Sequence, residues 1–103
     1  MIAHLVIWTW HPSVTAEQVE GLVHTLRELT ADMPSLHRYE CGPALGLRQG
    51  GDFGVVAVVH DAAGLDAYLD DPRHRDVATR VIGPMAASRI AVQIEASPTF
   101  AGQ

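Results

Sequence analysis

The segment Tyr68-Leu-Asp-Asp-Pro-Arg-His74 carries the residue types best suited to chemistry in this chain. Proline fixes its own φ and disfavours helix in the preceding residue, so one helix is predicted to end at Asp71 and another to begin at Pro72. In a helix that starts there, positions 74, 77, 78 and 81 share one face. That face places a histidine in an apolar stripe, which reads His74, Val77, Ala78 and Val81.

A histidine in that position can serve as a general base, because its unperturbed pKa lies near neutral pH. Removing a proton next to a carbonyl also needs a donor for the developing oxyanion and an apolar pocket for the substrate. Tyr68 offers a phenol, and His4 shares a strand face with two apolar side chains. The catalytic candidates are therefore His74, Tyr68 and His4, and the substrate-binding candidates are Trp8, Val6 and Leu26.

A structural role accounts for the same residues. The His74 ring nitrogens could be satisfied by a backbone carbonyl or by the carboxylate of Asp70 or Asp71, at a packed junction between two helices. Tyr68 has helical spacing from Leu65, which is typical of a core aromatic residue, and His4 could be a satisfied core histidine. From the residues alone, both interpretations stay open.

Alternating and helical hydrophobic patterns predict the elements that position these side chains. Thr15 and Gln18 have the form of a capping box, Asp61 is a suitable N-cap, and the continuous β-branched run 55–59 predicts a central strand. In order, we predict a strand over 2–10, a helix over 16–33, strands over 36–45 and 55–59, a helix over 62–70, a broken helical segment over 72–83 and a strand over 89–96.

This order predicts a ferredoxin-like α+β domain, with an antiparallel four-stranded sheet and helices on one face. We place the domain at residues 1–97 and a flexible C-terminal tail at 98–103. The strands over 2–10 and 55–59 are apolar on both faces, although helices can cover only one. We therefore predict a homodimer through the helix-free sheet face, which would form a dimeric α+β barrel.

Composition narrows the partners. The chain has 103 residues, a net charge of −5 and only seven Lys and Arg, which argues against nucleic acid. Its arginines are dispersed, and the set Arg73, Arg75, Arg80 and Arg89 is typical of a solvated surface. No apolar run approaches the roughly 20 residues of a membrane span, and the N-terminus reads as a strand rather than a signal peptide. We expect a soluble, cytoplasmic protein without membrane contact.

No metal or organic cofactor is expected. The sequence lacks His-x-His, His-Glu-x-x-His and a carboxylate cluster, and it lacks a phosphate-binding glycine loop. Cys41 is the only cysteine, so it can form neither an intramolecular disulfide nor a thiolate metal cluster.

Over residues 1 to 96 the chain resembles the stress-responsive A/B barrel domain family, or Dabb family, whose members are dimeric α+β barrels. The resemblance rests on four features in this order: Ile2-Ala-His4, Thr15-Ala-Glu-Gln18, Pro34-Ser-Leu, and Tyr68-x-x-x-Pro72-x-His74. It implies the same fold, the same dimer and a site around the last motif.

One plant member of this family is a polyketide cyclase that performs an intramolecular aldol condensation without a cofactor. By that resemblance His74 matches the base, Tyr68 its hydrogen-bonding partner and His4 a pocket histidine. Two departures stand against a complete cyclase site. Asp71 replaces the first histidine of a His-Pro-x-His run, and Phe53-Gly54-Val55 lacks a further pocket histidine.

Three functions stay open: cofactor-free aldol cyclisation of a small apolar or aromatic molecule, a non-catalytic stress-related assembly, and a cofactor-independent monooxygenase-like barrel. The cavity discriminates among them. A space of roughly 300 Å³ or more with His74 at its edge would favour a ligand, whereas a space filled by side chains would favour a structural role.

Overall fold

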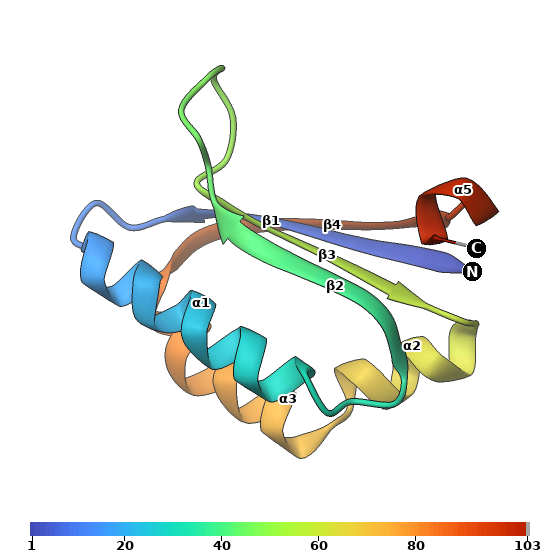
Figure 1. Cartoon of the computed structure of the whole chain (residues 1–103). Coiled ribbons are helices and arrows are strands. Elements are labelled where there is room, and N and C mark those ends of the chain that lie inside the picture. The colour runs from blue at the N-terminus through green and yellow to red at the C-terminus, as the bar shows by residue number, and fades with distance from the viewer. Residues whose placement is uncertain (103) are drawn as a thin grey trace.

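Four strands form one antiparallel sheet in the order β2-β3-β1-β4 in the computed structural model, which describes residues 1–102 (Figure 1). Their bounds are β1 (Ile2–Trp10), β2 (Leu36–Pro43), β3 (Phe53–Val59) and β4 (Ala86–Glu95). The two strands predicted to be apolar on both faces, β1 and β3, occupy the centre. The ferredoxin-like α+β fold predicted from the order of elements is confirmed.

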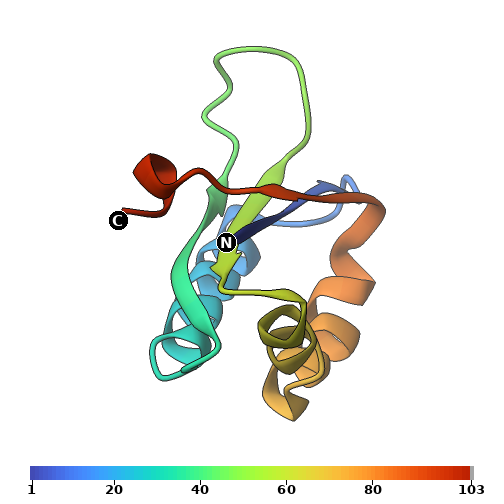
Figure 2. The same ribbon diagram turned by 90° about the vertical axis from the view of Figure 1, so that its right-hand side faces the viewer.

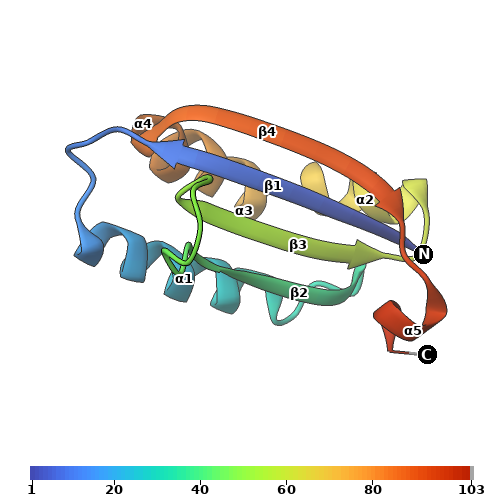
Figure 3. The same cartoon turned by 90° about the horizontal axis from the view of Figure 1, so that it is seen from above.

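The main helices cover a single face of the sheet, as Figures 2 and 3 show. They are α1 (Ala16–Thr30), α2 (Ala62–Leu69) and α3 (Pro72–Val77), followed by the short turns η1 (Ala78–Ile82) and α4 (Gly83–Met85). The Thr15 and Gln18 capping box begins α1 as predicted. Asp71 caps α3 by accepting a 2.8 Å hydrogen bond from the Arg73 amide, so the predicted break before Pro72 is confirmed.

The helical segment after Pro72 differs from the prediction at its far end. Residues 78–82 form a π-helical turn, in which backbone hydrogen bonds reach five residues instead of four. The extra residue in this turn moves the inward position from Val81 to Ile82. Ile82 is therefore buried and Val81 is exposed, whereas the predicted stripe placed Val81 inside.

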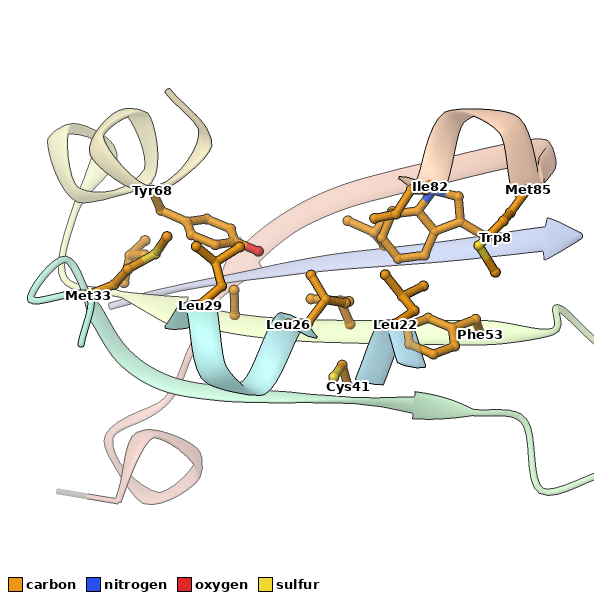
Figure 4. Close-up of a cluster of buried hydrophobic side chains, with 14 residues drawn as sticks. Trp8, Leu22, Leu26, Leu29, Met33, Cys41, Phe53, Tyr68, Ile82 and Met85 are labelled. Carbon is orange, nitrogen blue, oxygen red and sulfur yellow. The ribbon is translucent and has the colours of Figure 1, made fainter. Parts of the chain in front are cut away.

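The hydrophobic core lies between the sheet and the helices (Figure 4). Its largest fully buried side chains include Tyr68 from α2, Phe53 from β3, and Leu22 and Leu26 from α1. These residues follow the helical and alternating spacings in the sequence, so the core is where the patterns predict it.

The opposite face of the sheet is largely uncovered and apolar. Ile7 on β1 and three residues of β4 lie exposed on it, namely Ile90, Val92 and Ile94. The strand β4 begins three positions before the predicted start at Arg89. No helix within residues 1–102 is long and apolar enough to cross a membrane.

The C-terminal segment differs from the predicted flexible tail at 98–103. Residues Pro98–Ala101 form α5, which lies on the helix-free side of the sheet in Figure 1. Ala101 is buried against Ala3 and Val58, while the Arg38 guanidinium donates to the Phe100 carbonyl at 2.6 Å. These contacts order the segment through residue 102, and position 103 lies outside the described residues.

Candidate active site

A cavity of about 170 Å³ lies between the sheet and the segment running from α2 to α4. The strand β1 contributes three wall residues, and others come from α2, α3 and β4. They include His4, Val6 and Trp8 from β1, Tyr68 from α2, His74 from α3 and Arg89 from β4. All three predicted catalytic candidates and two of the three predicted binding residues therefore surround one space.

Strand alternation explains which side chains enter the cavity. His4 pairs with Gln93 across the β1–β4 ladder, and Trp8 pairs with Arg89. Alternate residues of a strand point to the same face, so both pairs face the helices. On this face of β4, Arg89 borders the cavity and Gln93 contacts His4. The apolar residues Ile90, Val92 and Ile94 lie on the uncovered face.

The His4 ring is held by a neighbouring amide. The Gln93 Nε2 atom lies 2.8 Å from His4 Nδ1, and an amide NH₂ group can only donate, so Nδ1 accepts. The neutral ring then carries its proton on Nε2. Burial lowers the pKa of His4, and the positive charge of Arg89 and the nearby His74 lower it further. At neutral pH, His4 is therefore an uncharged hydrogen-bond donor.

His74 combines burial with an unpartnered nitrogen. Its Nδ1 atom is buried and has no hydrogen-bond partner among residues 1–102. Burial lowers the pKa of His74, and the positive charge of Arg89 lowers it further. The Leu69 carbonyl and the Asp71 carboxylate act in the opposite direction, but burial has the larger effect. The ring is thus neutral at pH 7 and has the lone pair that a general base requires.

The carboxylate expected to satisfy His74 in a purely structural role is engaged elsewhere. The Asp71 carboxylate accepts three hydrogen bonds from Arg73. The donors are the Arg73 backbone N–H, Nε at 3.3 Å and Nη2 at 3.2 Å. Neither Asp70 nor Asp71 makes a hydrogen bond to the His74 ring among the described residues. A carboxylate partner for His74 is therefore absent among the described residues, and the Leu69 backbone carbonyl is the group that favours the protonated ring.

Tyr68 contacts both histidines through its ring. Its ring centroid lies 4.6 Å from that of His74 and 6.3 Å from that of His4. Burial raises the pKa of Tyr68 to about 12, so its hydroxyl stays protonated at neutral pH. Within residues 1–102, no hydrogen bond joins this hydroxyl to either histidine. Tyr68 therefore contacts His74 by ring packing, and not through the hydrogen bond that the resemblance implies.

Leu26 is the predicted binding residue that does not reach the cavity. It is 2% exposed and belongs to the core beneath α1, where Figure 4 shows it beside Leu22 and Leu29. The helix α1 packs against β2, whereas the cavity is bordered by the segment from α2 to α4 and by no described residue of α1. The sequence pattern shows that Leu26 is buried but not which part of the core it enters.

Two residues near the cavity, Arg89 and Gln93, are absent from the sequence prediction. The sequence feature that could have indicated them is the alternation of residues along β4, which places Arg89 and Gln93 on one face. Assigning that face requires the β1–β4 register, and a single sequence does not supply it.

In the part of the chain that the structure describes, the largest other hollow on the surface lacks buried titratable groups. A hollow of about 790 Å³ runs along the outer face of α1, beside Val19, Val23 and Pro43. It is larger but wide open, and its titratable side chains are exposed, including a His24–Glu28 pair at 3.3 Å. Among the described residues, no group of three or more His, Cys, Asp or Glu is arranged to hold a metal ion.

Comparisons with known proteins agree with this fold. Residues 2–96 match the profile of the stress responsive A/B barrel domain. A dimeric ferredoxin-like protein of unknown function from Thermobifida fusca is 42% identical, with a TM-score of 0.84 over 92% of this chain and 90% of that chain. No match was found among curated proteins.

Two solved structures with named activities share the fold at low identity. A hydroxynitrile lyase from Passiflora edulis is 15% identical, with a TM-score of 0.78 over 96% of this chain and 95% of that chain. An antibiotic biosynthesis monooxygenase is 18% identical, with a TM-score of 0.70 over 95% of this chain and 100% of that chain. At these identities the similarity extends to the fold alone.

Proposed function

The chain belongs to the stress-responsive A/B barrel domain family, and on that premise we propose that it binds a small organic molecule in the His74 cavity and catalyses cofactor-free proton transfer there. The observation that carries this proposal is the imidazole of His74 in the wall of an apolar cavity, with a pKa that burial lowers. A neutral imidazole there has a ring nitrogen that can take a proton from a bound ligand.

The proposed reaction begins with removal of a proton from carbon next to a carbonyl group. His74 accepts that proton, and negative charge moves onto the carbonyl oxygen. The protonated Tyr68 hydroxyl and the Nε2–H of His4 are the donors that would stabilise this oxygen. In an aldol condensation, the resulting enolate carbon then attacks a second carbonyl of the same molecule. The protonated His74 returns its proton to the alkoxide that forms, and loss of one water completes the condensation.

The cavity size favours a compact substrate. Its volume of about 170 Å³ is below the roughly 300 Å³ predicted to favour a ligand, so that condition is not met and a drug-sized molecule does not fit. It is close to the roughly 150 Å³ of an apolar cavity that accommodates benzene. A single-ring or short-chain carbonyl compound therefore fits the proposal better than an extended polyketide.

The alternatives predict other properties. A non-catalytic assembly protein needs no ligand, so this alternative predicts that small carbonyl compounds neither bind in the cavity nor exchange their α-protons. A cofactor-independent monooxygenase would consume oxygen with a quinol-like substrate. The name of one low-identity structural neighbour points that way.

We also propose that two copies pack through their helix-free sheet faces. Ile90 and Ile94 are 68% and 53% exposed there, and solved relatives with this fold are described as dimeric. Burying this apolar face in a second copy would remove it from water, which supplies the driving force. This packing leaves the His74 cavity on the opposite face of the sheet.

Exchange of carbon-bound hydrogen tests the catalytic proposal while the natural substrate is unidentified. The protein is incubated in D₂O with small β-keto acids, cyclic 1,3-diketones and aryl ketones, and the α-proton signals are followed by NMR. We expect exchange of at least one compound about 10²-fold or more above an equal concentration of free imidazole. Exchange at the imidazole rate for the whole panel would contradict the proposal.

A further inference from the structure

We propose that Arg89 selects an anionic ligand, namely a compact carboxylate whose charged end meets the guanidinium at the mouth of the cavity. This inference rests on the proposed function, because it assigns a ligand class to the same cavity. It adds a specificity-determining residue that is separate from the proton-transfer groups.

The charge of the cavity wall points to this assignment. Among residues 1–102, Arg89 is the one charged side chain that borders the cavity. The remaining titratable groups of the wall are His4, His74 and Tyr68, all uncharged at neutral pH. The wall therefore carries a single positive charge, although the whole chain has a net charge of −5.

Arg89 is also without an acidic partner. The chain contains 12 Asp and Glu residues, and three of its arginines pair with them, namely Arg27, Arg73 and Arg80. No carboxylate among the described residues lies within 4.0 Å of the Arg89 guanidinium. Its forked donors are available, and a carboxylate matches them in two parallel hydrogen bonds.

The rest of the wall sets the shape of the ligand. Val6, Trp8 and Ile82 offer an apolar interior, and Arg89 is exposed at its edge. A molecule with one ring or a short carbon chain fills the roughly benzene-sized interior and leaves its carboxylate at the edge. Benzoate has this form, and benzamide is its uncharged counterpart of nearly the same shape.

The test compares the two probes by isothermal titration calorimetry at pH 7.5 and low salt. We expect the wild-type protein to bind benzoate about tenfold or more tightly than benzamide. Arg89→Gln should abolish this preference, and Arg89→Lys should keep part of it. Arg75→Gln is the matched control, because it removes an equally charged, exposed side chain on α3 outside the cavity wall.

Three outcomes would overturn the assignment: equal binding of the two probes by the wild type, binding of neither, or an unchanged benzoate preference in Arg89→Gln. A second measurement covers a variant that folds poorly. In wild-type protein, imidazole NMR should show the pKa of His4 and His74 rising on saturation with benzoate but not with benzamide. An identical response to both probes would contradict the role of charge.

Failure of this inference and failure of the proposed catalysis can be told apart. Equilibrium binding does not depend on proton transfer, so His74→Gln should keep the benzoate preference. Selective benzoate binding without any α-proton exchange would refute catalysis and support Arg89 as the selecting residue. Exchange of α-protons together with equal binding of benzoate and benzamide would support catalysis and refute Arg89 as the selecting residue.

Discussion

The rings of Tyr68 and His74 lie with their centroids 4.6 Å apart and their planes at 57°, although a helix end, a capped turn and a helix start separate them in the chain. Asp71 and Pro72 set this geometry by stopping α2 and restarting the helix in a new direction. The contact fixes one side of the His74 ring and keeps it away from water. The lowered pKa of His74 therefore depends on Tyr68 as well as on its own position.

Removing only the Tyr68 hydroxyl should have little effect on His74. We predict that Tyr68→Phe changes the free energy of unfolding by less than about 1 kcal/mol and leaves the His74 pKa below its ordinary value, because the ring contact remains. Tyr68→Ala should cost about 3–5 kcal/mol and raise the His74 pKa as water enters. Urea unfolding measures the change in stability, and an NMR titration of the histidine ring protons measures the His74 pKa. A normal His74 pKa in Tyr68→Phe would show that the hydroxyl, not the ring, sets the shift.

Leu26 should matter for stability and not for ligand binding. We predict that Leu26→Ala lowers the free energy of unfolding by about 2–5 kcal/mol, because it leaves a void in the core beneath α1. Benzoate affinity, measured below the unfolding transition, should stay within about threefold of wild type, since Leu26 does not border the cavity. A selective loss of affinity with unchanged stability would restore Leu26 as a binding residue.

Stability should fall on mild acidification. In the folded protein, His4 and His74 have pKa values below the 6.5 of an ordinary histidine, which applies to the unfolded chain. At a pH between the two values, the unfolded chain binds more protons than the folded protein, so acid favours unfolding. The free energy of unfolding should therefore be level above about pH 7 and decrease below about pH 6.5. Arg89, Tyr68 and Asp71 also face or flank these rings, and their charge states do not change in this window. Thermal unfolding from pH 7.5 to 5.5 should show a smaller loss for His74→Gln, and an identical loss would contradict this origin.

The helix-free face should control assembly. We predict that Val92→Asp, at a position 52% exposed in one copy, converts a dimer to a monomer, because it would bury an unpaired carboxylate in the apolar interface. Val81→Asp is the control, since Val81 is 38% exposed on the helical side. Light scattering coupled to size exclusion gives the mass of each. A monomeric wild type, or a Val92→Asp dimer, would refute the proposed interface.

Local signals in the sequence predict much of the fold. The capping box at Thr15, the break before Pro72 and the β-branched run of β3 act through neighbouring residues, and each is found where predicted. The four-strand order follows from the sequence of elements. The family resemblance also directs attention to His74, Tyr68 and His4, which share one cavity.

The features that could not be predicted depend on distant parts of the chain. The pairing of Trp8 with Arg89 requires the β1–β4 register, so Arg89 is indistinguishable from a surface arginine in the sequence. The π-helical turn that buries Ile82 has no local signature comparable to a proline or a capping residue. Burial of Ala101 arises from packing of α5 on the sheet, which the local sequence of residues 98–101 does not reveal.

The most direct test of the central claim compares α-proton exchange by wild type, His74→Gln and His24→Gln, using the compound that wild type exchanges fastest. His24 is an exposed histidine on α1, so its substitution controls for loss of an imidazole. We predict that His74→Gln loses about 10²-fold or more of the exchange rate while His24→Gln retains it. A His74→Gln protein that is folded and exchanges the proton at the wild-type rate would contradict the assignment of His74 as the base.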